Sequence, residues 1–506
     1  MATTKQPTRR FVLLPARGMQ AHAAAGTASV GPTLLAMNAA LQSQGMKAAV
    51  ISVASGPKIR VVDSIHEDGA KLVEMTEDQV HQLKAAEPGL RIVPEVFFKP
   101  ALYRPSVESA ATLKAGRVAT KIGLTVVSKA DGKPCAGVKV VAFTDFANRE
   151  GAMGTTGASG KVSLALGAAS KKLERLYAFA EVGFWSALRK GVTLKQGTIL
   201  KLDPIDLAFV DCVRHFHGST ALAAGLGVTV GVVDSGVDTT HPDLQLAGGR
   251  NTVVGEPETD FGDNGGHHGS HVAGIIAGRG TPPTGIRGIA PAVTLRSYRV
   301  FGKHVDGRKD LASNFSIAKA IDRAVADGCD LINLSLGGGS PDDALRSAIA
   351  DARARGSVAI IAAGNDDRSP VSFPASDALA IAVAAVGRKG TFPGGSESAG
   401  DIAAPFGADK RDFVASFSNV GPEIDLAGPG VGVISTVPGG YAIMSGTSMA
   451  CPAVTGVAAR LLAADAGIMG MPRDQARSDA IAKLLLQSAR LLGFGPTFEG
   501  CGLPPG

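Results

Sequence analysis

The sequence predicts an α/β protein in which a doubly wound, mostly parallel sheet follows a small α+β domain and a small β-sandwich. Three patterns predict this architecture. Residues 1–103 alternate between strand and helix signals, residues 118–206 show short alternating strands, and from about Leu226 apolar strands alternate with helices. A chain of 506 residues has room for about three domains.

The first domain, residues 1–103, reads as a strand and a helix, then a run of strands, then a second helix and a closing strand. One helix is expected at Pro32–Gln44, and a second begins after Thr76, because Thr76 and Gln79 form a capping signature. The expected strands are Arg10–Pro15, Ala48–Val53, Lys58–Ser64, Ala70–Glu74 and Leu90–Phe98. This alternation predicts a ferredoxin-like split βαβ domain.

Residues 104–117 are interpreted as a linker, and residues 118–206 as an immunoglobulin-like or transthyretin-like β-sandwich. Turns such as Asp131–Pro134 and Ala158–Gly160 separate short strands of alternating polarity. No catalytic cluster occurs in this stretch of sequence, so a spacer or a binding module is expected.

The third domain comprises residues 207–506. Its apolar strands are separated by helical patterns, which is typical of a parallel sheet covered on both faces. The expected strands are Val228–Val233, Val293–Val300, Cys329–Leu336, Ser357–Ala363 and Ala380–Val386, and the expected helices are Phe315–Ala326, Asp342–Arg355 and Gln475–Leu492. Catalytic groups are then expected beyond the carboxyl ends of the strands.

Composition excludes several kinds of partner. The formal net charge is +6, and no Lys/Arg run is interleaved with aromatic residues, so no nucleic-acid partner is expected. No apolar span of about 18 residues is recognised, so no membrane partner is expected either. The five cysteines are widely spaced, and the apolar run Phe11–Leu14 is too short for a signal peptide. We therefore expect a cytoplasmic location, with secretion by a route other than Sec as the alternative.

Ser448 stands at the start of an apolar helix pattern. Hardly a charge occurs between it and Arg460, which favours a helix packed on all sides. Pro452 is tolerated only in the first turn, so the helix is expected to begin at about Thr447 or Ser448. The hydroxyl would then lie at the positive end of a buried helix. Taken alone, such a serine is better explained as an N-cap.

An acid, a base and an amide accompany this serine. Asp234 closes an apolar strand, and His268 lies in a glycine-rich segment before a helix. A serine hydroxyl is a weak nucleophile until an imidazole takes its proton, and a carboxylate fixes the imidazole tautomer. Asn365 follows another apolar strand and, with the backbone N–H of Ser448, can supply an oxyanion hole.

Four segments, in this order, resemble the motifs of the subtilisin-like serine proteases: Val232–Asp238, His268–Gly274, Ala363–Asn365 and Gly446–Pro452. The similarity covers roughly residues 225–502. It implies a subtilisin-like fold and a serine endopeptidase that hydrolyses protein or peptide substrates through an acyl-enzyme. The segment Val386–Arg411 is longer than the family core needs, so a mobile surface insertion is expected there.

The resemblance also assigns roles to single residues. Asp234 would orient His268, which would act as general base and then as acid, while Ser448 attacks and Asn365 stabilises the oxyanion.

Further residues would bind the substrate, namely Ser335, Leu336, Gly337, Ala362, Ala363 and Gly364. The segment Ser335–Gly337 would pair with the substrate backbone as an added strand. Gly337 and Ala362–Gly364 would wall the pocket for the residue before the cleaved bond. A medium to large apolar or aromatic side chain is expected in that pocket, with Ser372 narrowing its floor.

Two segments of the first domain, Gly69–Val80 and Ile92–Glu95, resemble the inhibitor propeptide of this family. The resemblance implies a zymogen whose N-terminal domain is an intramolecular inhibitor and is removed by autocatalytic cleavage. The tail Val93–Tyr103 is expected to lie through the active site, with Tyr103 in the apolar pocket and its bond to Arg104 cut. An attached inhibitor acts at a high effective concentration.

Other interpretations stay open. A catalytically silent scaffold that binds peptides through the sandwich and the cleft is the alternative to an enzyme. His267, His268 and His271 could bind a metal, but no glutamate follows in a zinc-protease pattern, so no metal site is expected. No cofactor is expected to be required. Asp243 matches a calcium ligand of the family, yet the loop Gly278–Thr284 lacks the usual Asn, which argues against a structural calcium site.

Overall fold

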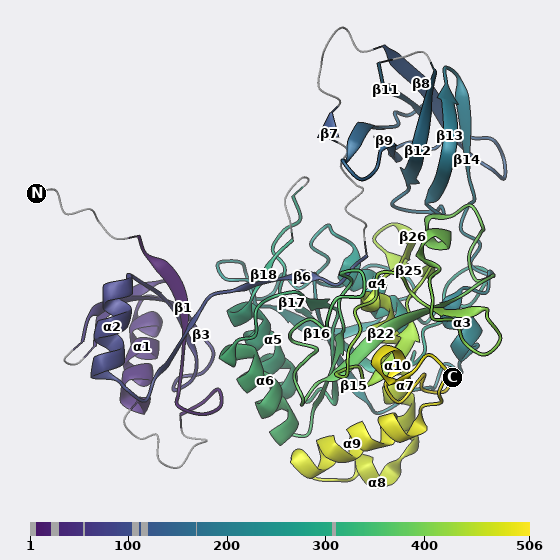
Figure 1. Cartoon of the computed structure of the whole chain (residues 1–506). Helices are drawn as coiled ribbons and strands as arrows, with labels where there is room; N and C mark the ends of the chain where they lie inside the picture. The colour runs from purple at the N-terminus through teal and green to yellow at the C-terminus, as the bar shows by residue number, and fades with distance from the viewer. Residues whose placement is uncertain are drawn as a thin grey trace, which may run out of the picture.

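The computed structural model of the chain describes residues 7–21, 30–53, 56–103, 111–112, 120–167, 170–305 and 310–506. Figure 1 shows an N-terminal α+β unit, a β-sandwich and a large α/β unit that adjoins both. Most of the expected linker, residues 104–117, lies outside the described residues. Its described part, β7 (Ala111–Thr112), pairs with a strand of the sandwich.

The N-terminal unit is a five-stranded antiparallel sheet in the order β2-β3-β4-β1-β5. Its elements are β1 (Arg9–Leu14), α1 (Gly31–Ser43), β2 (Ala49–Ser52), β3 (Lys58–Ser64), β4 (Lys71–Met75), α2 (Glu77–Ala86) and β5 (Arg91–Pro94). Helix α2 begins with the capping box expected from Thr76 and Gln79. The strand expected at Leu90–Phe98 divides in two, because β6 (Phe97–Pro100) leaves this sheet and pairs with the α/β unit.

Both faces of this small sheet are covered. Leu13 packs in a core shared with α1 and α2, whereas its neighbours Val12 and Leu14 pack in a core shared with α5 and α6 of the α/β unit. Side chains alternate between the two faces of a strand, so the run of apolar residues in β1 serves both cores. Figure 1 shows the N-terminal unit beside α5 and α6, with β6 crossing between the units.

The sandwich consists of a five-stranded sheet, β13-β12-β9-β10-β7, packed on a three-stranded sheet, β11-β8-β14. Its remaining strands are β8 (Lys121–Ser128), β9 (Lys139–Asp145), β10 (Glu150–Thr155), β11 (Lys161–Ala165), β12 (Ser170–Phe179), β13 (Ala187–Lys195) and β14 (Thr198–Leu202). The loop between β12 and β13 carries Trp185, which is buried in the main core of the α/β unit.

The α/β unit is built on an eight-stranded sheet whose path is β16-β17-β15-β19-β21-β22-β23, with β24 also paired to β22. The strands are β15 (Thr229–Asp234), β16 (Leu246–Asn251), β17 (Thr294–Arg299), β19 (Leu331–Leu334), β21 (Val358–Ala362), β22 (Ile381–Arg388), β23 (Asp412–Val414) and β24 (Leu426–Pro429). Every pair is parallel except β22 with β23. The mostly parallel sheet predicted from the apolar strands is confirmed.

Helices cover this sheet on both sides. They are α3 (Cys212–His217), α4 (His268–Ala277), α5 (Asn314–Ala326), α6 (Asp343–Ala354), α7 (Thr447–Ala464), α8 (Ala466–Met469), α9 (Gln475–Ser488) and α10 (Pro496–Glu499). Four short strands complete the unit: β18 (Ala312–Ser313), β20 (Leu336–Gly337), β25 (Val433–Val437) and β26 (Gly440–Met444).

Helix α7 is the central helix of the α/β unit. It begins at Thr447, as predicted, but Pro452 lies inside the helix and not in its first turn. A proline has no N–H to donate to the carbonyl four residues earlier, which here belongs to Ser448. The Ser335 hydroxyl donates to that carbonyl at 3.0 Å and so replaces the missing donor.

Among the described residues, α7 is also the one helix long and apolar enough to cross a membrane, although no such span was recognised in the sequence. In the structure 78% of its apolar window is buried inside the protein. Its hydropathy therefore reflects a position in the core.

The segment Val386–Arg411 was expected to be a mobile surface insertion. It instead lies between the α/β unit and the sandwich, and includes the 3-10 helix η2 (Glu397–Asp401). The backbone N–H of Glu397 donates to Ser186 O at 2.8 Å, and that of Leu188 donates to Gly395 O at 3.2 Å.

Candidate active site

Asp234 and His268 meet at the carboxyl end of the parallel sheet. Asp234 is the last residue of β15, is fully buried, and lies 2.7 Å from Nδ1 of His268 through its Oδ1 atom. His268 is the first residue of α4. Its Nε2 atom is buried and has no hydrogen-bond partner among the described residues. The pair thus presents an imidazole whose second nitrogen is available to accept a proton.

Ser448 is the second residue of α7 and is fully buried. Its hydroxyl donates to Ser335 O at 3.3 Å, a weak contact from which Oγ must turn toward His268 before it can lose its proton. The backbone N–H of Ser448 lies at the free, positive end of α7. That N–H donates to the carbonyl oxygen of Ala101 at 3.1 Å.

Asn365 donates through Nδ2 to the same carbonyl oxygen of Ala101. Its amide is fixed from the other side, because Oδ1 accepts from the N–H of Thr447 at 2.8 Å and from the Thr447 hydroxyl at 3.0 Å. Two donors of different origin therefore converge on one carbonyl oxygen, which is the geometry of an oxyanion hole.

The chain itself occupies the cleft. Strand β6 lies between β18 and β20, with Ala312 opposite Phe98 and Leu336 opposite Pro100. Beyond β6, the N–H of Ala101 donates to Ser335 O at 2.9 Å, and that of Tyr103 donates to Ser445 O at 3.0 Å. The residues Ser335–Gly337, expected to pair with a substrate backbone, thus pair with residues 99–101 of the same chain.

The register of this segment corrects one expectation. Tyr103 does not enter the pocket before the cleaved bond, and the bond to Arg104 is not at the oxyanion donors. The carbonyl oxygen of Ala101 lies at these donors instead, so the bond presented to Ser448 is Ala101–Leu102.

Phe98 sets the register. Its fully buried ring is 6.1 Å from that of Phe373 and lies so close to Gly339 that a Cβ there would collide with it. Tyr103 consequently lies two residues beyond the oxyanion donors, where its ring stacks on Phe417 at 4.4 Å. Sequence reasoning matched the large Tyr103 side chain to a large pocket, but a different aromatic residue fixes the chain.

The remaining predicted pocket residues surround Ala101. Ala362 ends β21, and Ala363 and Gly364 follow it, with Gly364 at a φ of +105°. A Cβ on Gly337 would lie 3.5 Å from Ser372 Cβ and 4.0 Å from Ala362 O. Gly337, Ala362 and Ser372 therefore lie close together, and their role as a substrate pocket stays a prediction.

Comparison with known proteins identifies the family. The profile of the Subtilase family, Peptidase S8, matches residues 225–502. The chain belongs to the subtilase family. Its relatives include Subtilisin BL of Lederbergia lenta, 40% identical over 246 residues that make up 48% of this chain and 78% of that protein. M-protease of Shouchella clausii is 39% identical over 246 residues, 48% of this chain and 55% of that protein.

This subtilase is accordingly a serine endopeptidase of the subtilisin type, which acts on protein or peptide substrates. The expectation of a cytoplasmic location is wrong, because the relatives are secreted, extracellular subtilisins. The number of cysteines was not a valid guide to the location of the protein. Four of the five free cysteines are buried packing residues, which carry no information about the surrounding redox conditions.

Histidines near the site do not form a metal centre in the described part of this subtilase, where no cluster of three metal-binding side chains occurs. His271 Nε2 lies 3.1 Å from Val433 O and 3.2 Å from Ala442 O. Burial and the nearby His268 lower the pKa of His271 to about 3, so it is neutral.

Asp243, the calcium ligand that the family resemblance implies, is bound by protein donors. Its Oδ2 atom accepts from the N–H of Ile286 at 2.8 Å and from the Tyr441 hydroxyl at 2.9 Å. A calcium ion needs oxygen ligands whose lone pairs are free, whereas this oxygen already accepts two hydrogen bonds. These residues therefore do not fit a calcium site.

Proposed function

We propose that Asp234, His268 and Ser448 are the catalytic triad of this endopeptidase and that Asn365 completes its oxyanion hole. Ser448 Oγ forms a bond to the substrate carbonyl carbon while its proton passes to His268 Nε2. The oxyanion accepts hydrogen bonds from Asn365 and from the N–H of Ser448. His268 then protonates the leaving amine as the peptide bond breaks, and water hydrolyses the acyl-enzyme by the reverse proton transfers.

The observation that carries this proposal is the position of Ala101 O, held by both donors. A peptide carbonyl already lies where negative charge would develop. Reaction with a fluorophosphonate probe tests the assignment: processed wild type should be labelled, and Ser448→Ala, which has no nucleophile and stays uncut, should not. Equal labelling of the two would contradict it.

We further propose that residues 1–101 are an inhibitory propeptide, that 118–206 are a separate sandwich domain and that 207–506 are the peptidase domain. The N-terminal unit is held against α5 and α6 by polar contacts as well as by β6. Lys319 Nζ lies 3.0 Å from Asp63 Oδ2, and the N–H of Met19 donates to Asp351 Oδ2 at 2.8 Å. This docking places β6 in the cleft before any substrate arrives.

Self-cleavage is proposed at Ala101–Leu102. Sequencing the N-termini of wild type and Ser448→Ala, expressed side by side, tests it. A new terminus at Leu102 in wild type alone is expected. A terminus at Arg104, or an uncut chain with full activity, would contradict the register.

The preference for a medium to large apolar residue before the cleaved bond remains a proposal. Ala101 is small, but Gly337 and Ala362 bring neither bulk nor charge to the space around it. Profiling with a peptide library should give Leu, Met or Phe above Asp or Lys at this position.

A further inference from the structure

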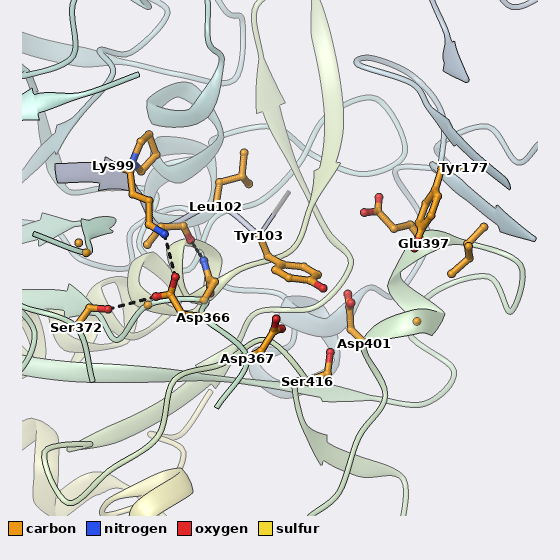
Figure 2. A pocket seen from close by; sticks show the side chains of 18 of the residues that line it. Lys99, Leu102, Tyr103, Tyr177, Asp366, Asp367, Ser372, Glu397, Asp401 and Ser416 are labelled. Atoms are coloured by element: carbon orange, nitrogen blue, oxygen red, sulfur yellow. Dashed lines mark hydrogen bonds and ion pairs between the residues drawn. The ribbon is translucent and has the colours of Figure 1, made fainter. Parts of the chain in front are cut away.

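A cavity of about 710 Å³ runs along the occupied cleft from Lys99 to Tyr103 and so lies on both sides of the bond presented at Ala101 (Figure 2). Three parts of the chain line its end beside Tyr103. The α/β unit contributes Asp367 and Ser416, and η2 contributes Glu397 and Asp401. The sandwich contributes Phe146, Arg149, Arg175, Tyr177, Leu188 and Lys190.

The sandwich is fixed in this position by its loop between β12 and β13. Trp185, the single tryptophan of the chain, is 3% exposed, and its ring lies 5.6 Å from Phe209 at 72°. Backbone hydrogen bonds join the same loop to the α/β unit, with the N–H of Gly183 donating to Tyr441 O at 2.9 Å. A buried aromatic anchor with flanking backbone bonds is a specific interface, so this wall is a constant part of the cavity.

Carboxylates surround the tip of the Tyr103 side chain. Figure 2 shows Tyr103 directed toward Asp401, with Glu397 and Tyr177 beyond and Asp367 beside it. The charges that act most on the Tyr103 hydroxyl are Asp401, Asp367 and Glu397; with burial, which is the larger cause, they raise its pKa. Carboxylates therefore face the tip of the side chain of the second residue after the cleaved bond, while Arg149, Arg175 and Lys190 line the sandwich side of the same cavity.

Asp401 gives independent evidence that this place receives a ligand. Its side chain is 4% exposed and lines the cavity, and its Oδ2 atom has no hydrogen-bond partner in the described part of the chain. Leaving a buried carboxylate oxygen without a donor is costly, so a donor from the substrate would be favoured there. Burial and then Glu397 raise the pKa of Asp401 well above its usual range, while Lys190 opposes this.

We propose that the sandwich and η2 complete a substrate subsite for the second residue after the cleaved bond, and that this subsite selects a side chain with an apolar stem and a hydrogen-bond donor at its tip. Tyr, Lys and Arg fit this description, whereas Asp and Glu do not. The stem lies on the Phe417 ring, and the tip reaches the carboxylates. The proposal rests on the substrate register proposed above and gives the sandwich a role in specificity.

Internally quenched peptides that differ only at this position test the subsite with processed wild-type enzyme. We expect kcat/KM for Tyr, Lys and Arg to exceed that for Glu by at least about tenfold, with Phe between them. Equal kcat/KM for all side chains, in an enzyme that has cut itself at Leu102 and is labelled at Ser448, would overturn this proposal alone. Absence of labelling would instead count against the proposed triad.

Substitutions in the cavity test which residues cause this side-chain preference. Asp401→Asn should reduce the ratio of kcat/KM for the Arg peptide to that for the Glu peptide toward one. Glu181→Gln is the matched control, because this exposed carboxylate lies on the sandwich loop outside the cavity. Glu397→Gln should act like Asp401→Asn and serves if that variant does not fold. Unchanged tryptophan fluorescence would show that the sandwich remains docked, and an unchanged ratio in both variants would contradict the proposal.

Discussion

The backbone N–H of Ser448 and the carbonyl oxygen of Ala101 lie 3.1 Å apart, at the first turn of α7. This contact joins the central helix of the α/β unit to a segment more than three hundred residues earlier in the chain. It fixes which peptide bond faces Ser448. Phe98, in the paired strand β6, and Tyr103 lie on either side of this contact.

Replacing Asn365 by Ala should lower kcat without a comparable rise in KM, because the amide meets its full partner only when the carbonyl oxygen becomes negative. The expected loss is about 10²- to 10³-fold, a range taken from loss of one such donor in subtilisin and not from this structure. Steady-state kinetics on one peptide would measure it. Thr447→Val, which removes one of the contacts that orient Asn365, should cost less. A kcat within about threefold of wild type in Asn365→Ala would remove this residue from the mechanism.

Phe98→Ala should weaken inhibition by the cleaved N-terminal domain. The Phe98 ring is fully buried between Gly339 and Phe373, and buried aromatic anchors cost about 2 kcal/mol or more when truncated, or about 30-fold in affinity. The fraction of active enzyme after dilution of the self-cleaved complex would report this. The neighbouring Phe97 is 50% exposed and provides a matched control. Equal effects of Phe97→Ala and Phe98→Ala would contradict the role of Phe98 in fixing the register.

Ser335→Ala should destabilise the protein by about 1–3 kcal/mol, since it leaves the buried carbonyl of Ser448 without a donor. In a Pro452→Ala background the loss should be smaller, because residue 452 then supplies the N–H that Ser335 replaces. Urea unfolding of the four proteins, all with Ser448→Ala to prevent autolysis, gives a double-mutant cycle. Additive effects would show that the Ser335 hydroxyl and Pro452 are unrelated.

Acid should unfold the α/β unit readily. The pKa of His217 is lowered to about 3 by burial and by Arg460 and Arg490, and that of His271 to about 3 by burial and by His268. In the unfolded chain both take a proton below about pH 6.5. Between these values the unfolded state binds more protons, so the free energy of unfolding falls with decreasing pH, by up to about 1.4 kcal/mol per pH unit for each histidine.

Urea unfolding of the Ser448→Ala protein at about pH 7.5 and pH 5 would measure this change in the free energy of unfolding. His217→Leu should make stability less dependent on pH, because neither ring nitrogen of His217 has a hydrogen-bond partner among the described residues. His215→Leu, at an exposed position in the same helix, is the control. No difference between the two variants would refute the assignment to His217.

The sheet and the family were predictable because their signals are local. Asp234 and Ala362 end apolar strands, and each of the four motifs is a short, contiguous segment that can be recognised without knowing the fold. The register in the cleft was not predictable, since it depends on how Phe98 meets Gly339, far away in the sequence. The role of Ser335 was also missed, although a proline inside a helix pattern could have indicated a carbonyl in need of a donor.

The residues that occupy the cleft lie on both sides of the Ala101–Leu102 bond. Residues up to Ala101 go with the N-terminal domain once that bond is cut, and dilution favours their departure because two molecules separate. Leu102 and Tyr103 stay covalently joined to the sandwich, so their departure is unimolecular and gains nothing from dilution. After self-cleavage, the new amino terminus would therefore compete with substrates for the cleft. The fraction of enzyme molecules whose cleft it fills would not depend on the enzyme concentration.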